Sequence, residues 1–517
     1  MAATETRVVT ETSTPTIPVR AMANPDLVKP AKAAPAQVIG LSPSDQIMAS
    51  DYVCFLMLFP LSSGSDYREV YSKLAAGLSL TLSEIPMIGG YVAPVEGSGG
   101  SKVQINVDED YGMELIYQDL TSPDSRAKFN YAYDELQRDH FPCSAFDPMA
   151  LMPLQLFMPN PEPAVMAVQT NFIQGGLIMA IGINHKASDG MTLAAILRAW
   201  AKHTKVAETI DGGLGAAIEN LTPRSMDRSS MCNGLAGGQI GDFPEYKLAN
   251  DPGATSAAQA EASANTATPA PAAPASQPHS PPGPLKLSVV HFSAERLALL
   301  KSAASPPTPS EGWISTNDAI CALLWRNISR VRADLARQHG SPLPPETPLN
   351  SAVAVEARRR LALPEEYLGN ANFYCPVSSD LGTVASPSTP LPTIARLIRE
   401  AVGGFDARRI RGAIGLIESM AKASDLQIRV FEDPMRGLIV TSWADMGLYD
   451  SEWGAGLGKA ESVRVPNVTL PGGAPICGIF PRRPDGGVEV MMLVEEEAIQ
   501  ALKADEEFAA FAEWRGT

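Results

Sequence analysis

Gly175-Gly-Leu-Ile-Met-Ala-Ile-Gly-Ile-Asn-His-Lys-Ala-Ser-Asp-Gly-Met-Thr-Leu-Ala-Ala-Ile-Leu197 joins an apolar run to an amphipathic one. The apolar run at 177–183 is typical of a buried strand, and the residues after Gly190 are typical of a helix. His185 and Asp189 lie at the junction between the two. A histidine in that place can act as a general base, because its unperturbed pKa is near neutrality. The stretch therefore predicts a strand–helix unit with a candidate reaction site at its turn.

The chain has 517 residues, of which 45% are hydrophobic and 19% are charged, so it can form two or three domains with buried cores. Its formal net charge of −16 argues against nucleic acid and anionic membranes as partners, since both bind clustered Lys and Arg. No apolar run reaches the length of a membrane-spanning helix. The N-terminus lacks the pattern of a secretory signal, so we expect a cytoplasmic protein.

The six cysteines are far apart and form no CxxC pair, and the six histidines show no HExxH or other paired-ligand spacing. We therefore expect reduced, mostly buried thiols and no metal site.

Strand and helix patterns alternate along the whole chain, which predicts an α/β or α+β class with at least two mixed sheets. Strands are predicted at 52–59, 165–172, 177–184, 285–292, 351–356, 372–377, 438–443, 474–480 and 488–493. Helices are predicted at 67–82, 190–206, 293–303, from 315 through 331, as a pair within 390–424, and as a terminal pair within 494–515.

Composition divides the chain into four parts. These are a disordered leader at 1–38, an N-terminal domain at 39–210, a linker at 211–284, and a C-terminal domain at 285–517. Within the linker, residues 252–283 are almost all Ala, Pro, Ser, Thr and Gln. Such a segment cannot bury enough apolar area to offset its chain entropy, so we expect a disordered insertion.

The HxxxDG pattern from His185 to Gly190 has a structural and a chemical interpretation. Asp189 suits the N-cap of the following helix, where its carboxylate meets the positive end of the helix. His185 could be an ordinary strand-end histidine or a base. From the residues alone, both interpretations stay open.

This pattern resembles the HxxxDG acyltransferases: the BAHD family, the fungal trichothecene 3-O-acetyltransferase-like transferases and, more distantly, chloramphenicol acetyltransferase and peptide-synthetase condensation domains. The resemblance covers residues 39–515 apart from the insertion. It implies a two-domain chloramphenicol acetyltransferase-like fold in which a crossover segment near 372–400 joins the N-terminal sheet. It also implies that His185 is the general base and that Asp189 faces away from the substrate and pairs with Arg358. Gly190 is then part of the structure around the site.

The family's second signature, D-F-G-W-G, matches Asp450-Ser-Glu-Trp453-Gly454 in part. Asp450, Trp453 and Gly454 agree with it, while the Phe and the first Gly are replaced. Fungal members commonly show such a loosened version, and the loop is mainly structural in the family. The resemblance therefore implies a structural role for these three residues.

Three shorter segments also look like the family. Leu41-Ser-Pro-Ser-Asp-Gln46 is similar to the opening of the fungal transferases, and Tyr367-Leu-Gly-Asn370 is similar to the turn after the crossover. Ser315-Thr-Asn-Asp-Ala319 is similar to the start of a helix beside the CoA channel. On that basis Ser315 and Thr316 are the candidate CoA-binding residues.

Thr441-Ser-Trp443 occupies the position where related transferases place a Thr/Ser-x-Trp facing the reacting carbonyl. The hydroxyl of Thr441 and the indole N–H of Trp443 could donate to the oxyanion, each worth about 3 kcal/mol by analogy with other oxyanion sites. Alternatively, Trp443 is a large strand-end residue at a domain interface.

The resemblance implies a monomeric, CoA-dependent acyltransferase that moves an acyl group, most plausibly acetyl, to a hydroxyl of a secondary metabolite; an amine is the second choice. Acyl-CoA is its co-substrate, and no cofactor is bound permanently. One alternative is a condensation-like enzyme that uses a carrier-protein thioester. Its motif usually has two adjacent histidines, and here Asn184 precedes His185. The other alternative is a non-catalytic binding subunit, which the intact HxxxDG pattern argues against.

Overall fold

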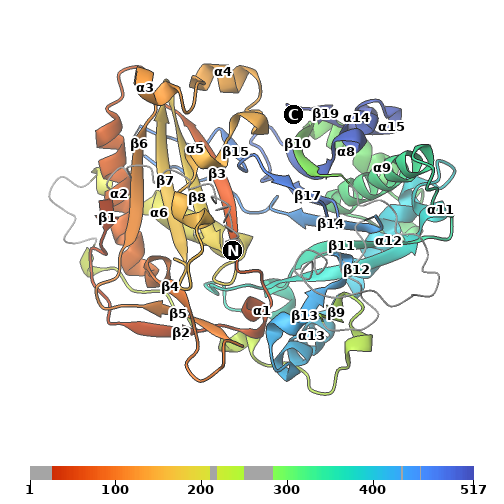
Figure 1. The fold of residues 1–517 in the computed structure, drawn as a ribbon, viewed down its shortest axis with the longest axis horizontal. Helices are drawn as coiled ribbons and strands as arrows, with labels where there is room; N and C mark the ends of the chain where they lie inside the picture. Colours follow the sequence, from red (N-terminus) through yellow and green to blue (C-terminus); the bar gives the residue numbers. More distant parts are fainter. Residues whose placement is uncertain (1–25, 210–217, 250–282, 432–434, 455, 517) are drawn as a thin grey trace, which may run out of the picture.

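The computed structural model describes residues 26–209, 218–249, 283–431, 435–454 and 456–516. The predicted insertion at 252–283 lies outside these residues, apart from its last position. Figure 1 shows two large sheets, one in each half of the chain, with helices packed against both.

The N-terminal sheet has six strands. Their order is β1 (Asp26–Val28), β6 (Met113–Asp119), β7 (Met166–Ile173), β8 (Gly176–Asn184), β3 (Tyr52–Pro60) and β15 (Ser462–Arg464). Every residue of β7 and β8 is buried. These strands therefore form the centre of a sheet that is covered on both faces. One face packs against α2 (Tyr67–Glu84) and α6 (Gly190–Thr209).

The C-terminal sheet has eight strands and combines parallel and antiparallel pairs. Its order is β12 (Asn372–Asp380), β11 (Pro348–Glu356), β14 (Gly437–Ser442), β17 (Ile476–Ile479), β18 (Val488–Glu495), β10 (Leu285–Phe292) and β16 (Thr469–Leu470), with β19 (Glu513–Trp514) also paired to β10. The long helix α9 (Thr316–Gln338) buries its apolar stripe against this sheet.

Shorter elements complete the two halves (Figure 1). Small sheets are formed by β2 (Gln37–Gly40), β5 (Val103–Val107) and β4 (Tyr91–Pro94), and by β13 (Leu426–Ile428) and β9 (Tyr246–Leu248). The other helices are α1 (Pro43–Gln46), α3 (Pro123–Arg126), α4 (Tyr133–Arg138), α5 (Pro148–Leu151), α8 (Ala294–Ala304), α10 (Arg358–Leu361), α11 (Leu381–Val384), α12 (Leu391–Gly404), α13 (Ala407–Ser419), α14 (Glu496–Lys503) and α15 (Glu506–Phe511). None of the described helices is long and apolar enough to span a membrane.

The predicted α/β class with mixed sheets is confirmed, and the strongly patterned elements lie within a few residues of their expected bounds. The start of α9 shows why. Ser315 accepts a hydrogen bond from the Asp318 N–H, and the Asp318 carboxylate accepts one from the Ser315 N–H. This capping box is readable from sequence, because its parts are three residues apart.

Two predictions about the organisation of the chain are wrong: the sheet that segment 372–400 joins, and the extent of the disordered leader. Segment 372–380 does not join the N-terminal sheet; as β12 it pairs along its whole length with β11 in the C-terminal sheet. The crossover is instead β15, which pairs antiparallel with β3. The leader is not disordered throughout 1–38, since residues 26–28 pair with β6 and residues 37–40 pair with β5. Both strands are too short to show a period, so only their distant partners define them.

The segment 446–463 comes late in the chain but packs into the core of the N-terminal half. Trp453 is fully buried, and its ring lies 5.7 Å from Phe59 and 5.4 Å from Trp200. Leu457 and Val463 belong to the same cluster. The two halves of the chain therefore share one core at this point.

Candidate active site

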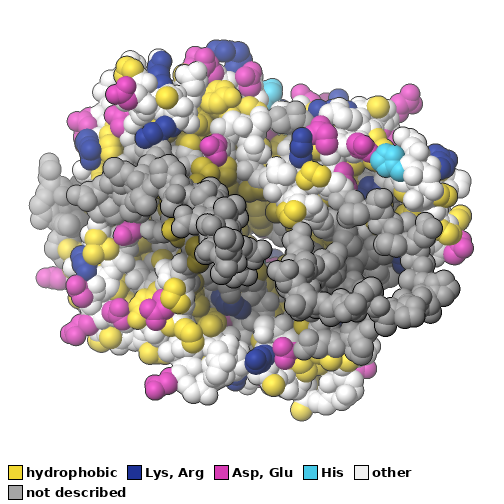
Figure 2. Space-filling model, in the orientation of Figure 1, with side chains coloured by type: hydrophobic (Ala, Val, Ile, Leu, Met, Phe, Trp, Pro, Cys, Tyr) yellow, Lys and Arg dark blue, Asp and Glu magenta, His cyan; other side chains and the backbone are white. Residues whose placement is uncertain are grey.

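A cavity of about 210 Å³ lies between the two sheets. Its walls come from β3, β8 and the start of α6 on one side, and from β11, β12, β14 and β17 on the other. Figure 2 shows the molecule hollowed between its two halves, with hydrophobic side chains inside the hollow. The residues that line the cavity and matter to the chemistry are His185, Asp189, Gly190, Glu356, Asn372, Tyr374, Thr441 and Trp443.

His185 follows the last residue of β8, and its main-chain N–H donates to the Asp51 carbonyl at 2.9 Å. The ring lines the cavity and is partly exposed. Its Nδ1 is buried and has no hydrogen-bond partner in the described part of the chain. The predicted position of this histidine at the end of a strand is therefore confirmed. Its imidazole is available to a molecule bound in the cavity.

Asp189 is held by four donors and is only 5% exposed. Its carboxylate accepts from the main-chain N–H of Thr192 at 2.9 Å, which caps α6, and from that of Ala371 at 2.9 Å. Arg358 contacts both oxygens, at 2.8 and 3.0 Å. These four hydrogen bonds fix the carboxylate between the start of α6, Arg358 and the turn before β12, which fits a structural role.

Charge compensation keeps this buried pair ionised. Burial alone would raise the pKa of Asp189, but the charge of Arg358 and its hydrogen bonds outweigh burial and hold that pKa below its ordinary value. Burial likewise acts to lower the pKa of Arg358, and Asp189 raises it overall. Arg358 also donates to the Gly369 carbonyl at 2.8 Å and to the Thr192 hydroxyl at 3.0 Å. The arginine thereby ties the turn before β12 to the start of α6.

Gly190 opens α6 beside the other wall of the cavity. A Cβ at this position would lie 3.4 Å from the Met446 sulfur and 3.5 Å from Cδ1 of Trp443. These are ordinary contacts, so a larger side chain would project into the cavity rather than clash with the backbone. The missing side chain leaves room next to Trp443.

Three successive carbonyls of the His185 loop are fixed from behind. Asn370 donates through Nδ2 to the carbonyls of His185 at 2.8 Å and Lys186 at 3.4 Å, and to Asp45 Oδ1 at 2.8 Å. The loop also holds its neighbour in turn, because the Lys186 ammonium donates to the carbonyls of Gln46 and Met48. The motif segments 41–46 and 367–370 therefore meet behind the His185 loop, although they are more than 300 residues apart.

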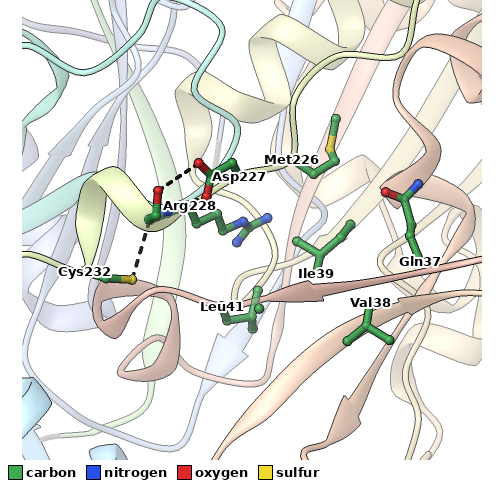
Figure 3. A pocket seen from close by; sticks show the side chains of 10 residues that line it. Gln37, Val38, Ile39, Leu41, Met226, Asp227, Arg228 and Cys232 are labelled. Carbon is green, nitrogen blue, oxygen red and sulfur yellow. Dashed lines mark hydrogen bonds between the residues drawn. The ribbon is translucent and has the colours of Figure 1, made fainter.

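Arg228 supplies the third contact, to the carbonyl of Ala187 at 2.8 Å, and it forms a buried ion pair with Asp45 at 2.8 Å. Figure 3 shows its side chain beside Ile39 and Leu41, in a second cavity of about 500 Å³ between β2 and residues 226–232. Sequence reasoning missed Arg228, because it lies in a segment without a periodic pattern.

Replacing Asn370 with Ala is expected to lower the free energy of unfolding by about 1–3 kcal/mol for each buried partner left unpaired. The partners are the Asp45 carboxylate and the His185 carbonyl. Urea unfolding followed by circular dichroism measures the change. Ser378→Ala, on the strand β12 that follows Asn370, is the control, since its hydrogen bond to Asn350 is exposed. Equal stability of the two variants would contradict the assigned role.

Thr441, near the end of β14, and Trp443, directly after that strand, line the same cavity as His185 but come from the C-terminal sheet. The Trp443 main-chain N–H donates to the Ile479 carbonyl at 2.8 Å. Its ring lies 4.7 Å from Phe55, across the interface between the halves, and 5.7 Å from Phe480. Both proposed interpretations of Trp443 therefore have a structural basis: it lines the cavity and it packs at the interface.

The loop at Asp450 is away from the cavity. Asp450 is exposed, Trp453 is buried in the shared core, and Gly454 adopts a left-handed φ of 60° that favours glycine. Ser315 and Thr316 do not line the His185 cavity either, and the Ser315 hydroxyl is occupied by its helix cap. Their expected contact with CoA stays a prediction.

Within the described residues, no cluster of three or more His, Cys, Asp or Glu side chains could hold a metal ion. The chemistry that these side chains can perform is proton transfer at His185 and hydrogen-bond donation from Thr441 and Trp443. Glu356, Asn372 and Tyr374 also line the cavity, and sequence reasoning gave none of them a role.

Comparison with known proteins gives this arrangement a context. The Transferase family model matches residues 20–509. Acyltransferase cm3D of Cordyceps militaris is 30% identical over 516 residues, covering 94% of this chain and 99% of that protein. Eremophilane O-acetyltransferase ORF8 of Penicillium roqueforti is 30% identical over 488 residues, covering 91% of this chain and 97% of that protein.

Solved structures agree with the fold. TRI101 of F. graminearum, complexed with coenzyme A and T-2 mycotoxin, superposes with a TM-score of 0.75 at 23% identity, covering 93% of this chain and 100% of that one. The resemblance inferred from the HxxxDG pattern is confirmed. The chain belongs to the Transferase family and is a BAHD-type acyltransferase.

Proposed function

We propose that this acyltransferase takes an acetyl group from acetyl-CoA and transfers it to a hydroxyl of a small metabolite, with His185 as the general base. The observation that carries the proposal is that His185, from the N-terminal half, and the pair Thr441/Trp443, from the C-terminal half, line one cavity. Two relatives support it: one is named an O-acetyltransferase, and TRI101 was crystallised with coenzyme A.

The reaction follows from these positions. His185 accepts the proton of the acceptor hydroxyl as its oxygen attacks the thioester carbonyl. The hydroxyl of Thr441 and the indole N–H of Trp443 donate to the oxyanion that forms. The C–S bond then breaks, the carbonyl re-forms, and the CoA thiolate takes the proton from His185. Asp189 stays bound to Arg358 throughout and holds the loop in shape.

Incubation of the pure protein with acetyl-CoA and a panel of hydroxylated terpenoid, alkaloid and polyketide metabolites tests the proposal. Release of free thiol, matched by an acetylated product in mass spectrometry, is the expected result. An amine panel measured in parallel distinguishes N-acylation. Thiol release with no acceptor dependence would contradict acyl transfer to a metabolite.

Trp443→Phe is expected to lower kcat by about 10²–10³-fold if its N–H donates to the oxyanion, with little change in KM. Phenylalanine keeps the ring contacts to Phe55 and Phe480, so a packing role alone would leave kcat nearly unchanged. Thr441→Val should act in the same direction. Trp514→Phe, outside the cavity, is the matched control. The measurement is steady-state thiol release with both substrates varied.

A further inference from the structure

The wall of the cavity formed by β11 and β12 carries a row of polar side chains on these two neighbouring strands. Glu356 of β11 lies directly opposite Asn372 of β12, and Ala354 lies opposite Tyr374 two residues further along. Successive residues of a strand point to opposite faces, so these four positions share the face that lines the cavity. Glu356, Asn372 and Tyr374 thus form one group, here called the β11–β12 polar row.

The polar row has hydrogen-bonding capacity that the described residues do not use. Asn372 Oδ1 is buried and without a partner. The Tyr374 hydroxyl makes no hydrogen bond to a described residue, and burial raises the pKa of Tyr374, so the hydroxyl stays protonated at neutral pH. Glu356 and Asn372 face each other within reach but do not bond. A buried amide oxygen with no partner among the described residues is poised to accept a hydrogen bond from a bound molecule.

Glu356 is held in a fixed orientation while part of it remains accessible. Its Oε1 accepts from the main-chain N–H of Arg358 at 2.8 Å and from the guanidinium of Arg358 at 3.1 Å. The side chain is still 38% exposed. A carboxylate only accepts hydrogen bonds, so its cavity side suits a donor.

The remaining walls are apolar. Val53, Phe55, Ile183, Met191 and Ile439 line the same space. Pockets of this kind bind a hydrocarbon framework by burial, and a few placed polar groups fix its orientation. A volume of about 210 Å³ suits a compact framework of one or two rings.

We propose that the acceptor carries a second hydrogen-bond donor, a hydroxyl or an amine, which binds the β11–β12 polar row while the reacting hydroxyl is presented to His185. This inference rests on the proposed function for the existence of an acceptor. The polar row orients the acceptor, and it makes the enzyme discriminate against analogues that lack the second group.

Binding to the wild-type protein in the presence of CoA, which carries no acyl group to transfer, tests the inference apart from turnover. The probes share one apolar skeleton: 2-decalol, decalin-2,6-diol and 6-amino-2-decalol. Isothermal titration in the presence of CoA should show the diol or the amino alcohol binding about tenfold more tightly than 2-decalol, because only they can donate to the buried amide oxygen while a hydroxyl stays at His185. The diol arm and the amino alcohol arm distinguish hydroxyl from amine. Equal dissociation constants for all three compounds overturn the inference.

Substitutions in the polar row test whether its side chains cause the preference for a second donor group. Asn372→Leu and Tyr374→Phe, each titrated in the presence of CoA, should reduce the ratio of dissociation constants toward one. Ile476→Val, which removes one methylene from an apolar position on the same wall, should leave the ratio unchanged. A ratio that survives both polar-row substitutions overturns the assignment. Failure of the wild-type protein to release thiol with acetyl-CoA counts against the proposed function, whereas the binding ratios are read independently of it.

Discussion

His185→Ala is expected to lower kcat for acetyl transfer by about 10²–10⁴-fold, the range that a positioned general base contributes. The ring lines the cavity, and its Nδ1 has no partner in the described chain, so no structural hydrogen bond of the imidazole is lost. The main-chain bonds of residue 185 to Asp51 and Asn370 do not depend on the side chain. Activity should therefore fall while the melting temperature changes little.

The measurement is thiol release with saturating acetyl-CoA, together with thermal unfolding followed by circular dichroism. His339→Ala is the matched control, because His339 is exposed at the end of α9 and contacts only an exposed carboxylate. Added imidazole should restore part of the lost activity, since a small base can occupy the vacated space. Full activity in the alanine variant would end the base assignment.

Asp189→Ala is expected to lower the free energy of unfolding by about 3–5 kcal/mol, because it leaves the buried guanidinium of Arg358 without its counter-charge. The same change removes the cap of α6 and the acceptor for the Ala371 N–H. Chemical denaturation gives the value. The double variant with Arg358→Met should be more stable than Asp189→Ala alone, since it removes the stranded charge. A double variant less stable than either single one would contradict this account.

The sign of the pH dependence follows from the same pair. The pKa of Asp189 is held below its ordinary value in the folded state, so its ionised form stabilises the protein at all pH values above the unfolded pKa, about 3.9. That contribution is lost as the pH falls below 3.9 toward the lower folded pKa. The free energy of unfolding of Asp189→Asn should therefore fall less steeply than that of the wild type as the pH drops below about 3.9.

Sequence was most informative where structure depends on neighbours in the chain. The apolar run before His185, the cap at Asp189 and the capping box at Ser315 are all local, and each was placed correctly. It was least informative where an element exists only through a distant partner. Strand β1 needs β6, and the crossover strand β15 is defined by its pairing with β3.

The site shows the same division. His185 could be found because a motif surrounds it, whereas Arg228 and Asn372 gain their meaning from atoms that lie close only after folding. Asn372 was inside a predicted strand, but its face could not be known before its pairing with Glu356. The acceptor-binding surface is thus the part of the site least visible in a single sequence.

The late segment 446–463 has a consequence for how the chain is made. Strand β3 ends at Pro60, yet its partner β15 begins at Ser462, about 400 residues later. At ribosomal rates of about 5–20 residues per second, the β3 edge stays uncovered for roughly 20–80 s during synthesis. An open strand edge beside an unfilled core invites pairing with other chains. We therefore expect a nascent chain to be prone to association at this edge until nearly its whole length has left the ribosome.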